Sequence, residues 1–257
     1  MSAYLDEVFG LGGKLAVVTG GSSGIGRAMA VAVGRAGARV VVVARRPEAL
    51  AETVAELRDL GIDAASVPAD LGDRVAVAGL VREVLDGYGE PDILVNSAAV
   101  NRRPPLGELS EEDWDLTVAA NLTAPFLLGQ AFGRRMAERG WGRIINVASQ
   151  QAFRAYGNSG AYGVSKAGLV ALTRSQAEAW SRRGVCCNAI APGVVHTPLT
   201  EEVFADASKV RAHAARSMIG RNGVPEDFAG CVVYLAGNAS AAVTGQTLFV
   251  DGGYSAT

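Results

Sequence analysis

The chain has 257 residues, of which 49% are hydrophobic and 19% are charged, and its formal net charge is −2. This balance is typical of a folded globular protein and excludes a disordered or fibrous chain. Acidic and basic residues are interspersed, without the basic stripe that a nucleic-acid-binding surface requires. No apolar run is long enough to cross a bilayer. We therefore expect neither nucleic acid nor a membrane as a partner.

The N-terminal segment and the cysteines favour a cytoplasmic location. Residues 1–13 carry Asp6 and Glu7 and lack the cationic segment followed by an apolar stretch that marks a secretory signal. The three cysteines are an odd number and do not have the spacing of metal ligands. We expect buried, reduced thiols in a cytoplasmic protein and no metal site.

Apolar runs alternate with helical patterns from residue 14 onward. Strands are expected at residues 14–19, 39–44, 63–67, 92–95, 143–147, 185–190 and 247–250. Helices are expected near residues 24–36, 47–60, 73–87, 111–139 and 161–182, and again from Pro225. This alternation predicts one α/β domain over residues 1–257, a Rossmann fold whose doubly wound parallel sheet has about seven strands with helices on both faces.

Residues 194–222 interrupt the alternation. They carry no strand signal, are punctuated by Pro198 and Gly220, and follow the carboxyl end of an expected strand. Open α/β sheets bind their ligands at this end of the strands. We therefore predict that the segment is a lid over the substrate.

The first expected strand runs directly into a glycine-rich turn, T-G-G-S-S-G-I-G at residues 19–26. Gly20, Gly24 and Gly26 lack the β-carbon that would block a phosphate, and the amides that open the next helix attract anions. The turn therefore predicts a site for a dinucleotide pyrophosphate. Its spacing is not the G-x-G-x-x-G form, and a purely structural glycine turn is the alternative.

The same turn has a second interpretation. Residues 20–24 match G-x-S-x-G, the nucleophile elbow of serine hydrolases, with Ser22 as the nucleophile. A hydrolase needs an acid and then a histidine later in the chain, and only His196 and His213 are present. No glycine-rich oxyanion loop precedes the turn, so we favour the dinucleotide site.

The second expected strand ends in Ala44, Arg45 and Arg46. An NAD enzyme usually has an acidic residue here that binds the ribose hydroxyls, which Ala44 cannot do. The planar donors of Arg45 can pair with the 2′-phosphate of NADP, and Arg46 adds positive potential. We therefore favour NADP(H) over NAD(H) as the cofactor, with a solvated pair of arginines as the alternative.

Several short motifs follow one another in a specific order. They are T-G-G-S-S-G-I-G at 19–26, N-S-A-A at 96–99, Asn121, Ser149, Y-G-V-S-K at 162–166, P-G at 192–193 and V-D-G-G at 250–253. In this order they resemble the short-chain dehydrogenase/reductase family, and the resemblance runs from residue 14 to the C-terminus. It implies an enzyme that interconverts a secondary alcohol and a ketone, with a nicotinamide as the hydride carrier.

The resemblance assigns catalytic roles to four residues. It implies that Tyr162 gives or takes the substrate proton and that Lys166 lowers the pKa of Tyr162 and holds the ribose. Ser149 orients the substrate oxygen, and Asn121 positions a proton-relay water. A tyrosine that titrates near ~10 in water needs a nearby cation to act at neutral pH, and Lys166 is one helical turn from Tyr162. A Tyr-x-x-x-Lys pair alone is more often a surface pair.

The resemblance also implies which residues bind the cofactor. Asp70 is expected to contact the adenine, Asn96 to support the strand and the cofactor, and Thr197 to bind the nicotinamide carboxamide. The full expected set is Gly20, Ser22, Ser23, Gly24, Ile25, Gly26, Arg45, Arg46, Asp70, Leu71, Asn96, Ala98, Tyr162, Lys166, Pro192, Gly193, Val195 and Thr197. Ala99 replaces a glycine that the family commonly has, so its methyl group is expected to narrow the ribose site slightly.

Within the family, N-R-R-P-P at 101–105 and L-F-V-D-G-G at 248–253 resemble gluconate 5-dehydrogenase and related sugar-acid dehydrogenases. Arg102 or Arg103 can pair with a substrate carboxylate, and solvated surface arginines are the equal alternative. A 3-oxoacyl-acyl-carrier-protein reductase or a broad-specificity carbonyl reductase would use the same four catalytic residues. A non-catalytic dinucleotide sensor is the remaining alternative. The resemblance further implies a homotetramer formed through the helices near 111–139 and 161–182.

Overall fold

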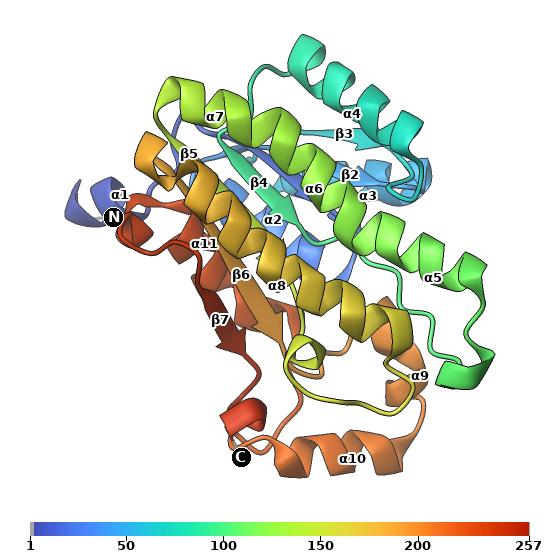
Figure 1. Ribbon diagram of the computed structural model, residues 1–257. Helices are drawn as coiled ribbons and strands as arrows, with labels where there is room; N and C mark the ends of the chain where they lie inside the picture. Colours follow the sequence, from blue (N-terminus) through green and yellow to red (C-terminus); the bar gives the residue numbers. More distant parts are fainter. Residues whose placement is uncertain (1–2, 257) are drawn as a thin grey trace.

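The computed structural model describes residues 3–256, so both ends of the domain predicted over 1–257 lie outside the described residues. Within them, seven parallel strands form one sheet in the order β3-β2-β1-β4-β5-β6-β7 (Figure 1). The strands are β1 Leu15–Thr19, β2 Arg39–Ala44, β3 Ala64–Pro68, β4 Ile93–Asn96, β5 Gly142–Val147, β6 Val185–Pro192 and β7 Thr247–Val250. This confirms the predicted doubly wound fold, and the strand order reverses between β1 and β4.

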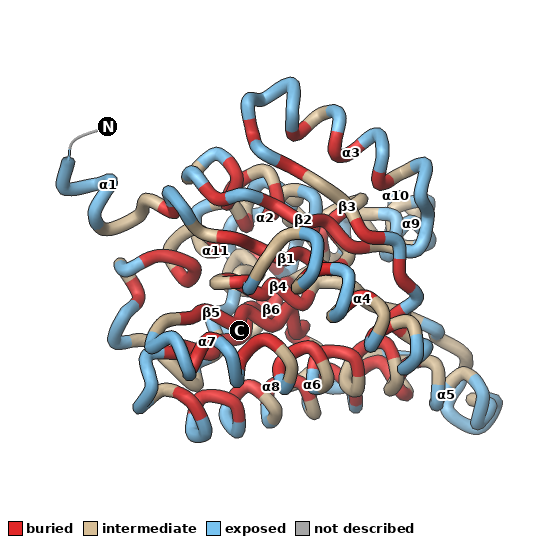
Figure 2. The backbone as a smooth tube through the Cα atoms, turned by 90° about the horizontal axis from the view of Figure 1, so that it is seen from above, coloured by how far each residue is buried: buried red, intermediate tan, exposed pale blue. Residues whose placement is uncertain are grey.

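Helices cover both faces of the sheet (Figure 2). Helices α2, α3 and α11 lie on one face and α4 to α8 on the other, while α9 and α10 lie beyond the carboxyl ends of the strands. Their bounds are α1 Ala3–Phe9, α2 Gly24–Arg35, α3 Pro47–Asp59, α4 Arg74–Gly87, α5 Glu111–Val118, α6 Ala124–Leu128, α7 Arg134–Arg139, α8 Gly160–Trp180, α9 Glu201–Phe204, α10 Ala207–Arg216 and α11 Ala229–Ala236. None of the helices in the described part is long and apolar enough to span a membrane.

Two hydrophobic clusters hold these layers together. Met29 of α2 and Phe228, just before α11, belong to the cluster on one face of the sheet. Phe132 and Trp180 belong to the cluster on the other face. Because helices cover both sides, β1, β4, β5 and β6 are buried along their whole length, which explains their continuous apolar runs.

The helix predicted at 111–139 is continuous but not regular. It consists of α5, α6 and α7, joined by π-helical turns at Ala119–Thr123 and Gly129–Gly133. Pro125 has no N–H to donate to the carbonyl of Asn121, and its ring crowds that carbonyl. The widened first π turn accommodates the proline, so the predicted long helix is present but contains π turns that were not predicted.

The second π turn admits side chains from α8. A β-carbon on Gly129 would lie 2.3 Å from Gln176 Nε2, and one on Gly133 would lie 2.6 Å from Trp180 Cζ3. At such distances a side chain at either position would require the contacted side chain of α8, or the helix that carries it, to shift. The two glycines therefore allow α8 to pack closely against the long helix.

Other differences lie at element ends and in short elements. Helix α1 was not predicted, because it buries no residue and so has no apolar pattern. Strand β6 continues to Pro192, two residues beyond the predicted end, because its last residues pair with β7. The helix predicted from Pro225 opens with a 3-10 turn at Pro225–Phe228 and becomes α-helical at α11. The predicted lid contains α9 and α10 and no strand among its described residues.

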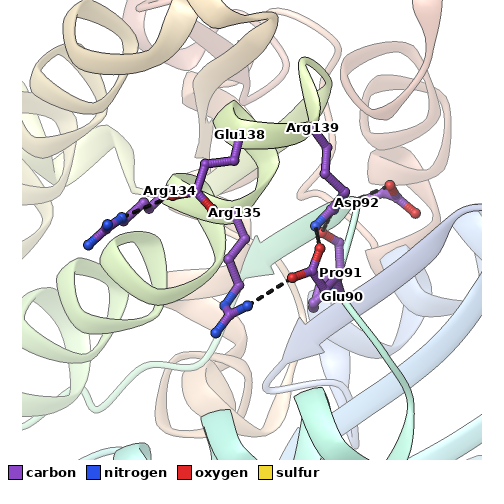
Figure 3. Close-up of polar contacts among 7 residues, drawn as sticks. All are labelled: Glu90, Pro91, Asp92, Arg134, Arg135, Glu138 and Arg139. Atoms are coloured by element: carbon purple, nitrogen blue, oxygen red, sulfur yellow. Dashed lines mark hydrogen bonds and ion pairs between the residues drawn. The ribbon is translucent and has the colours of Figure 1, made fainter.

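A group of ion pairs lies at the amino ends of the strands (Figure 3). Arg135 and Arg139 of α7 both pair with Glu90, the first at 2.8 Å between Nη1 and Oε1. Arg139 also donates to the carbonyl oxygen of Pro91 at 2.7 Å and faces Asp92 at 3.5 Å. These contacts fasten the end of the long helix to the segment before β4, and they lower the pKa of the Glu90 carboxyl.

Candidate active site

A cleft of about 380 Å³ opens at the carboxyl ends of the central strands, where the strand order reverses. Parallel α/β sheets bind their ligands at this position. Most of the predicted site residues line it: Gly20, Ser23, Gly24, Ile25, Gly26, Arg45, Asp70, Leu71, Ala98, Ser149, Tyr162, Lys166, Pro192, Gly193, Val195 and Thr197. The predicted residues outside the lining are Ser22, Arg46, Asn96 and Asn121.

The glycine-rich turn forms one wall of the cleft. Gly20 and Gly24 have left-handed φ angles of 67° and 51°, which glycine adopts at little cost. A β-carbon on Gly26 would lie 2.3 Å from the carbonyl oxygen of Gly20, so α2 can begin this close to the turn only without a side chain there. The side chain of Ser23, the N-cap residue, makes no capping bond, which leaves the first amides of α2 for an anion.

The end of β2 presents a cation to the cleft. Ala44 and Arg45 both line it, and no carboxylate stands at this strand end. Arg46 is exposed at the N-cap position of α3, outside the lining. The residues around this wall therefore fit a dinucleotide with a phosphate on its ribose, because a guanidinium can pair with phosphate oxygens.

The segment after β4 is held from two sides. Thr19 Oγ1, at the end of β1, accepts hydrogen bonds from the backbone N–H groups of Ser97 and Ala98 at 3.1 and 3.2 Å. Asn121 Oδ1 accepts from the N–H of Val100 at 2.7 Å, and Asn121 Nδ2 donates to the Val100 carbonyl at 2.8 Å. Asn121 is fully buried, so its side chain positions this wall of the cleft from behind.

Asn96 lies beneath the cleft in a buried polar network. Its Nδ2 donates to Asn146 Oδ1 at 2.8 Å. Asn146 Nδ2 donates in turn to Thr173 Oγ1 at 2.9 Å and to Gln176 Oε1 at 3.0 Å. Thr173 and Gln176 belong to α8, so the network links β4 and β5 to that helix.

Ser149 and Tyr162 meet where β5 and α8 approach each other. Ser149 Oγ accepts from the N–H of Gln151 at 3.1 Å and hydrogen-bonds the Tyr162 side chain. Lys166 lies one turn along α8, with its Nζ 5.7 Å from the centroid of the Tyr162 ring. That Nζ donates to the carbonyl oxygen of Val147 at 2.6 Å.

Burial controls the protonation of both α8 residues. It raises the pKa of Tyr162, while the Ser149 hydrogen bond and the charge of Arg103 lower that pKa by less. Burial also lowers the pKa of Lys166 to about 7. The expected lowering of the Tyr162 pKa by Lys166 is therefore not produced by these side chains alone. A tyrosine kept neutral in this way can act as a proton donor.

A second cavity, of about 350 Å³, adjoins the cleft and shares Ser149 and Tyr162 with it. Its other walls come from the segment after β4, the segment before α8 and the predicted lid. The lid contributes Glu202, Lys209 and His213 to this lining. Burial and the positive charges of Arg216 and Arg103 lower the pKa of His213, so its imidazole is neutral at pH 7.

The structure distinguishes the two arginines that the sequence left equivalent. Arg103 lines the second cavity and donates to the carbonyl oxygen of Gly157 at 3.2 Å. Arg102 lies outside the lining, and its Nε is 3.6 Å from Asp113 Oδ1 on the surface. Of the two, Arg103 is the one that a ligand in the cavity can reach.

Ala99, expected at the ribose site, also lines the cleft. Other lining residues were not among the predicted site residues: Val43, Ala44, Ala69, Ser97, Val100, Ala120, Val147, Ala148, Pro198, Leu199 and Thr200. Most are small or apolar residues next to strand ends, which have no distinctive chemistry. The available signal was position, since residues that follow a parallel strand meet at one edge of the sheet.

Residues 20–255 match a family model described as enoyl-(acyl carrier protein) reductase. Gluconate 5-dehydrogenase of Gluconobacter oxydans is 38% identical over 247 residues, 96% of this chain and 96% of that protein. D-Threitol dehydrogenase of Mycolicibacterium smegmatis is 41% identical over 254 residues, 98% of this chain and 96% of that protein.

The fold is also similar to that of a solved relative. The crystal structure of a gluconate 5-dehydrogenase from Burkholderia cenocepacia, in complex with NADP and tartrate, matches with a TM-score of 0.93 and 35% sequence identity. The match covers 98% of each chain, so it extends over the cleft and the 194–222 segment.

Proposed function

The chain belongs to the short-chain dehydrogenase/reductase family, and from this premise we propose that it is an NADP(H)-dependent enzyme acting on a sugar acid or polyol. It interconverts a secondary alcohol and the corresponding ketone. Membership of the family makes the chain an NAD(P)-dependent oxidoreductase, and the choice of NADP and of substrate is our proposal.

One observation carries the proposal. The hydrogen-bonded pair of Ser149 and Tyr162 lines both the cleft and the second cavity. A nicotinamide in the cleft and a carbonyl group in the second cavity would meet at these two hydroxyl groups. This is the arrangement that hydride transfer coupled to proton transfer requires.

The nicotinamide, when bound, supplies or accepts the hydride. During reduction, neutral Tyr162 donates its hydroxyl proton to the carbonyl oxygen, and the Ser149 hydroxyl hydrogen-bonds that oxygen as negative charge develops on it. Lys166 holds the ribose and, when protonated, stabilises the tyrosinate. We assign to Asn121 the positioning of a proton-relay water; its Nδ2 also donates to Ser165 Oγ at 3.1 Å, which ties Asn121 to α8.

The cofactor preference rests on the end of β2. Ala44 stands where an NAD enzyme has its ribose-binding carboxylate, and the guanidinium of Arg45, one position later, lines the cleft beside it. The Burkholderia cenocepacia relative binds NADP, which supports the same choice. In the lining of the cleft, we further assign the adenine contact to Asp70 and the carboxamide contact to Thr197.

The substrate class rests on the second cavity. Arg103 and Lys209 bring positive charge to its lining, and a carboxylate is the substrate group that pairs with a guanidinium. The relatives act on gluconate and on threitol, which combine hydroxyl groups with or without a carboxylate. Reduction of a 3-oxoacyl thioester is the second candidate, favoured by the description of the matching family model.

Three further parts of the proposal concern the whole chain. Residues 194–222 close over the substrate as a lid, since the lid side chain His213 lines the second cavity. The chain works as a homotetramer, to which the exposed apolar side chains of Phe126 and Val164 contribute. The enzyme is cytoplasmic, as the free state of Cys186, Cys187 and Cys231 suits a reducing compartment.

The test is the oxidation of NADPH and NADH by the purified protein with a panel of carbonyl compounds. The panel holds 5-ketogluconate, other keto sugars, a 3-oxoacyl thioester and simple aromatic ketones. Selective turnover of 5-ketogluconate or a keto sugar with NADPH is the expected result. Turnover of the thioester alone would move the enzyme to the second candidate class.

A further inference from the structure

Two amide oxygens beside the second cavity have no hydrogen-bond donor. Asn101 Oδ1 and Gln150 Oε1 are buried atoms without a partner among the described residues. Asn101 and Gln150 both line the second cavity, as do Ser149 and Tyr162. A buried acceptor that lacks a donor destabilises the folded protein, so each such atom calls for a physical reason.

Gln150 follows Ser149 directly and is only 2% exposed. Its Nε2 donates to the Tyr156 hydroxyl at 2.7 Å, which fixes one end of the amide and leaves Oε1 as the unused end. The terminal torsion of a glutamine is broad, so the amide can turn slightly toward a donor in the cavity. A hydroxyl group of a ligand bound in the cavity would supply such a donor.

The neighbouring glutamine shows the contrast. Gln151 lines the same cavity, but its Oε1 accepts a hydrogen bond from Ser159 Oγ at 2.8 Å. Of these two adjacent glutamines, one has its acceptor occupied by the protein and the other does not. The unpaired oxygen of Gln150 is therefore a property of its surroundings and not of glutamine side chains in this cavity as such.

The chemistry of the ligand group follows from the atoms. A ketone oxygen and a carboxylate only accept hydrogen bonds, whereas a hydroxyl group also donates. We infer that Gln150 and Asn101 accept hydrogen bonds from substrate hydroxyl groups and so select polyhydroxylated carbonyl compounds. The inference rests on the proposed function and adds the residues that bind the substrate hydroxyl groups, while Arg103 binds the carboxylate.

Two ketones with the same four-carbon skeleton test this subsite. Erythrulose carries three hydroxyl groups, and 2-butanone carries none. Gln150→Met keeps the length of the side chain and removes the acceptor, so kcat/KM for erythrulose should fall about tenfold or more. The value for 2-butanone and the Kd for NADPH should stay at the parent level, and Asn101→Leu should act in the same direction.

Gln151→Met is the matched control, because it removes an amide from the same cavity whose oxygen is already paired. It should leave the ratio of the two kcat/KM values unchanged. If Gln150→Met also keeps the parent ratio while the parent reduces erythrulose, the hydroxyl subsite is wrong and the proposed function stands. If the parent reduces no polyhydroxylated ketone, the proposed function is wrong and the inference falls with it. If Gln150→Met loses NADPH binding, Asn101→Leu is used in its place. A parent-level ratio of kcat/KM for erythrulose to kcat/KM for 2-butanone in Asn101→Leu would then contradict the hydroxyl subsite.

Discussion

At the scale of single residues, Lys166 and Tyr162 are two ionisable groups whose charged forms burial disfavours. Burial lowers the pKa of Lys166 to about 7 and raises the pKa of Tyr162, so the low polarity of the site acts on both in the direction of the neutral form. Neutral Tyr162 is ready to donate a proton. The tyrosinate that remains would then favour protonation of Lys166 nearby, which links the two groups in one titrating pair.

The buried amine of Lys166 makes the stability depend on pH. Its pKa is about 7 in the folded protein and 10.5 ordinarily, so between these values the unfolded chain binds more protons and stability rises with pH. Lys166→Met should therefore be more stable than the parent at pH 7, by on the order of a few kcal/mol, and lose this advantage toward pH 10. Urea unfolding at pH 7 and pH 9.5 measures it, and an equal difference at both pH values would contradict the buried neutral amine.

Arg45 is expected to decide between the two cofactors. Arg45→Ala removes a charge-assisted hydrogen bond to the 2′-phosphate, so the KM for NADPH should rise about 10- to 100-fold while that for NADH changes little. Arg46→Ala, which alters the exposed neighbour outside the cleft, should have a much smaller effect. Equal losses with both cofactors in Arg45→Ala would show that Arg45 does not hold the phosphate.

At the scale of elements, the site depends on how the long helix from α5 to α7 packs against α8. The π turn at Ala119–Thr123 carries Asn121, which holds the segment after β4. The π turn at Gly129–Gly133 lets Gln176 and Trp180 approach, and Gln176 belongs to the polar network beneath the cleft. Both turns thus fix α8 and, with it, Tyr162 and Lys166.

A methyl group in the second π turn should loosen this packing. The added β-carbon of Gly133→Ala would lie 2.6 Å from Trp180, so we expect a loss of about 1–3 kcal/mol in the free energy of unfolding. Gly230→Ala on the exposed side of α11 meets no atom within 4 Å and should be neutral or stabilising by up to about 1 kcal/mol. Urea unfolding compares the two, and similar stabilities would refute the packing argument.

The strands, the glycine-rich turn and the Tyr162–Lys166 pair could be predicted from the sequence because their signals are local. The apolar run of β1 and the glycines at positions 20, 24 and 26 lie next to each other in the chain, as do Tyr162 and Lys166. The close packing at the second π turn could not be foreseen, since it depends on a contact between Gly133 and Trp180 of another helix. The choice between Arg102 and Arg103 likewise depends on the path of an irregular segment, which has no periodic pattern.

At the scale of the whole molecule, the carboxyl ends and the amino ends of the strands differ in what they carry. The carboxyl ends of the strands carry the cleft and the second cavity, whereas the amino ends carry the ion pairs of Glu90 with Arg135 and Arg139 (Figure 3). The outer face of the α5–α8 layer exposes Phe126 and Val164, with 43% and 53% of their surface accessible. Apolar side chains exposed on neighbouring helices favour association of copies.

A charge on this face should prevent the proposed assembly. Phe126→Glu would place a carboxylate in the proposed apolar interface, so light scattering after size-exclusion chromatography should show a smaller species than the parent forms. Val75→Glu is the control, because Val75 is 76% exposed on α4, a different helix from those that carry Phe126 and Val164. A monomeric parent, or an unchanged mass for Phe126→Glu, would contradict the proposed tetramer contact.

The central claim is that Tyr162 transfers the proton where the cleft meets the second cavity, and one comparison tests it most directly. Steady-state reduction of 5-ketogluconate by NADPH is measured for the parent and for Tyr162→Phe, together with the Kd for NADPH from fluorescence. The account predicts that kcat falls about 10²- to 10⁴-fold while NADPH binding stays largely intact, because the hydroxyl acts on the substrate oxygen and not on the phosphates. Parent-level turnover by Tyr162→Phe would contradict it.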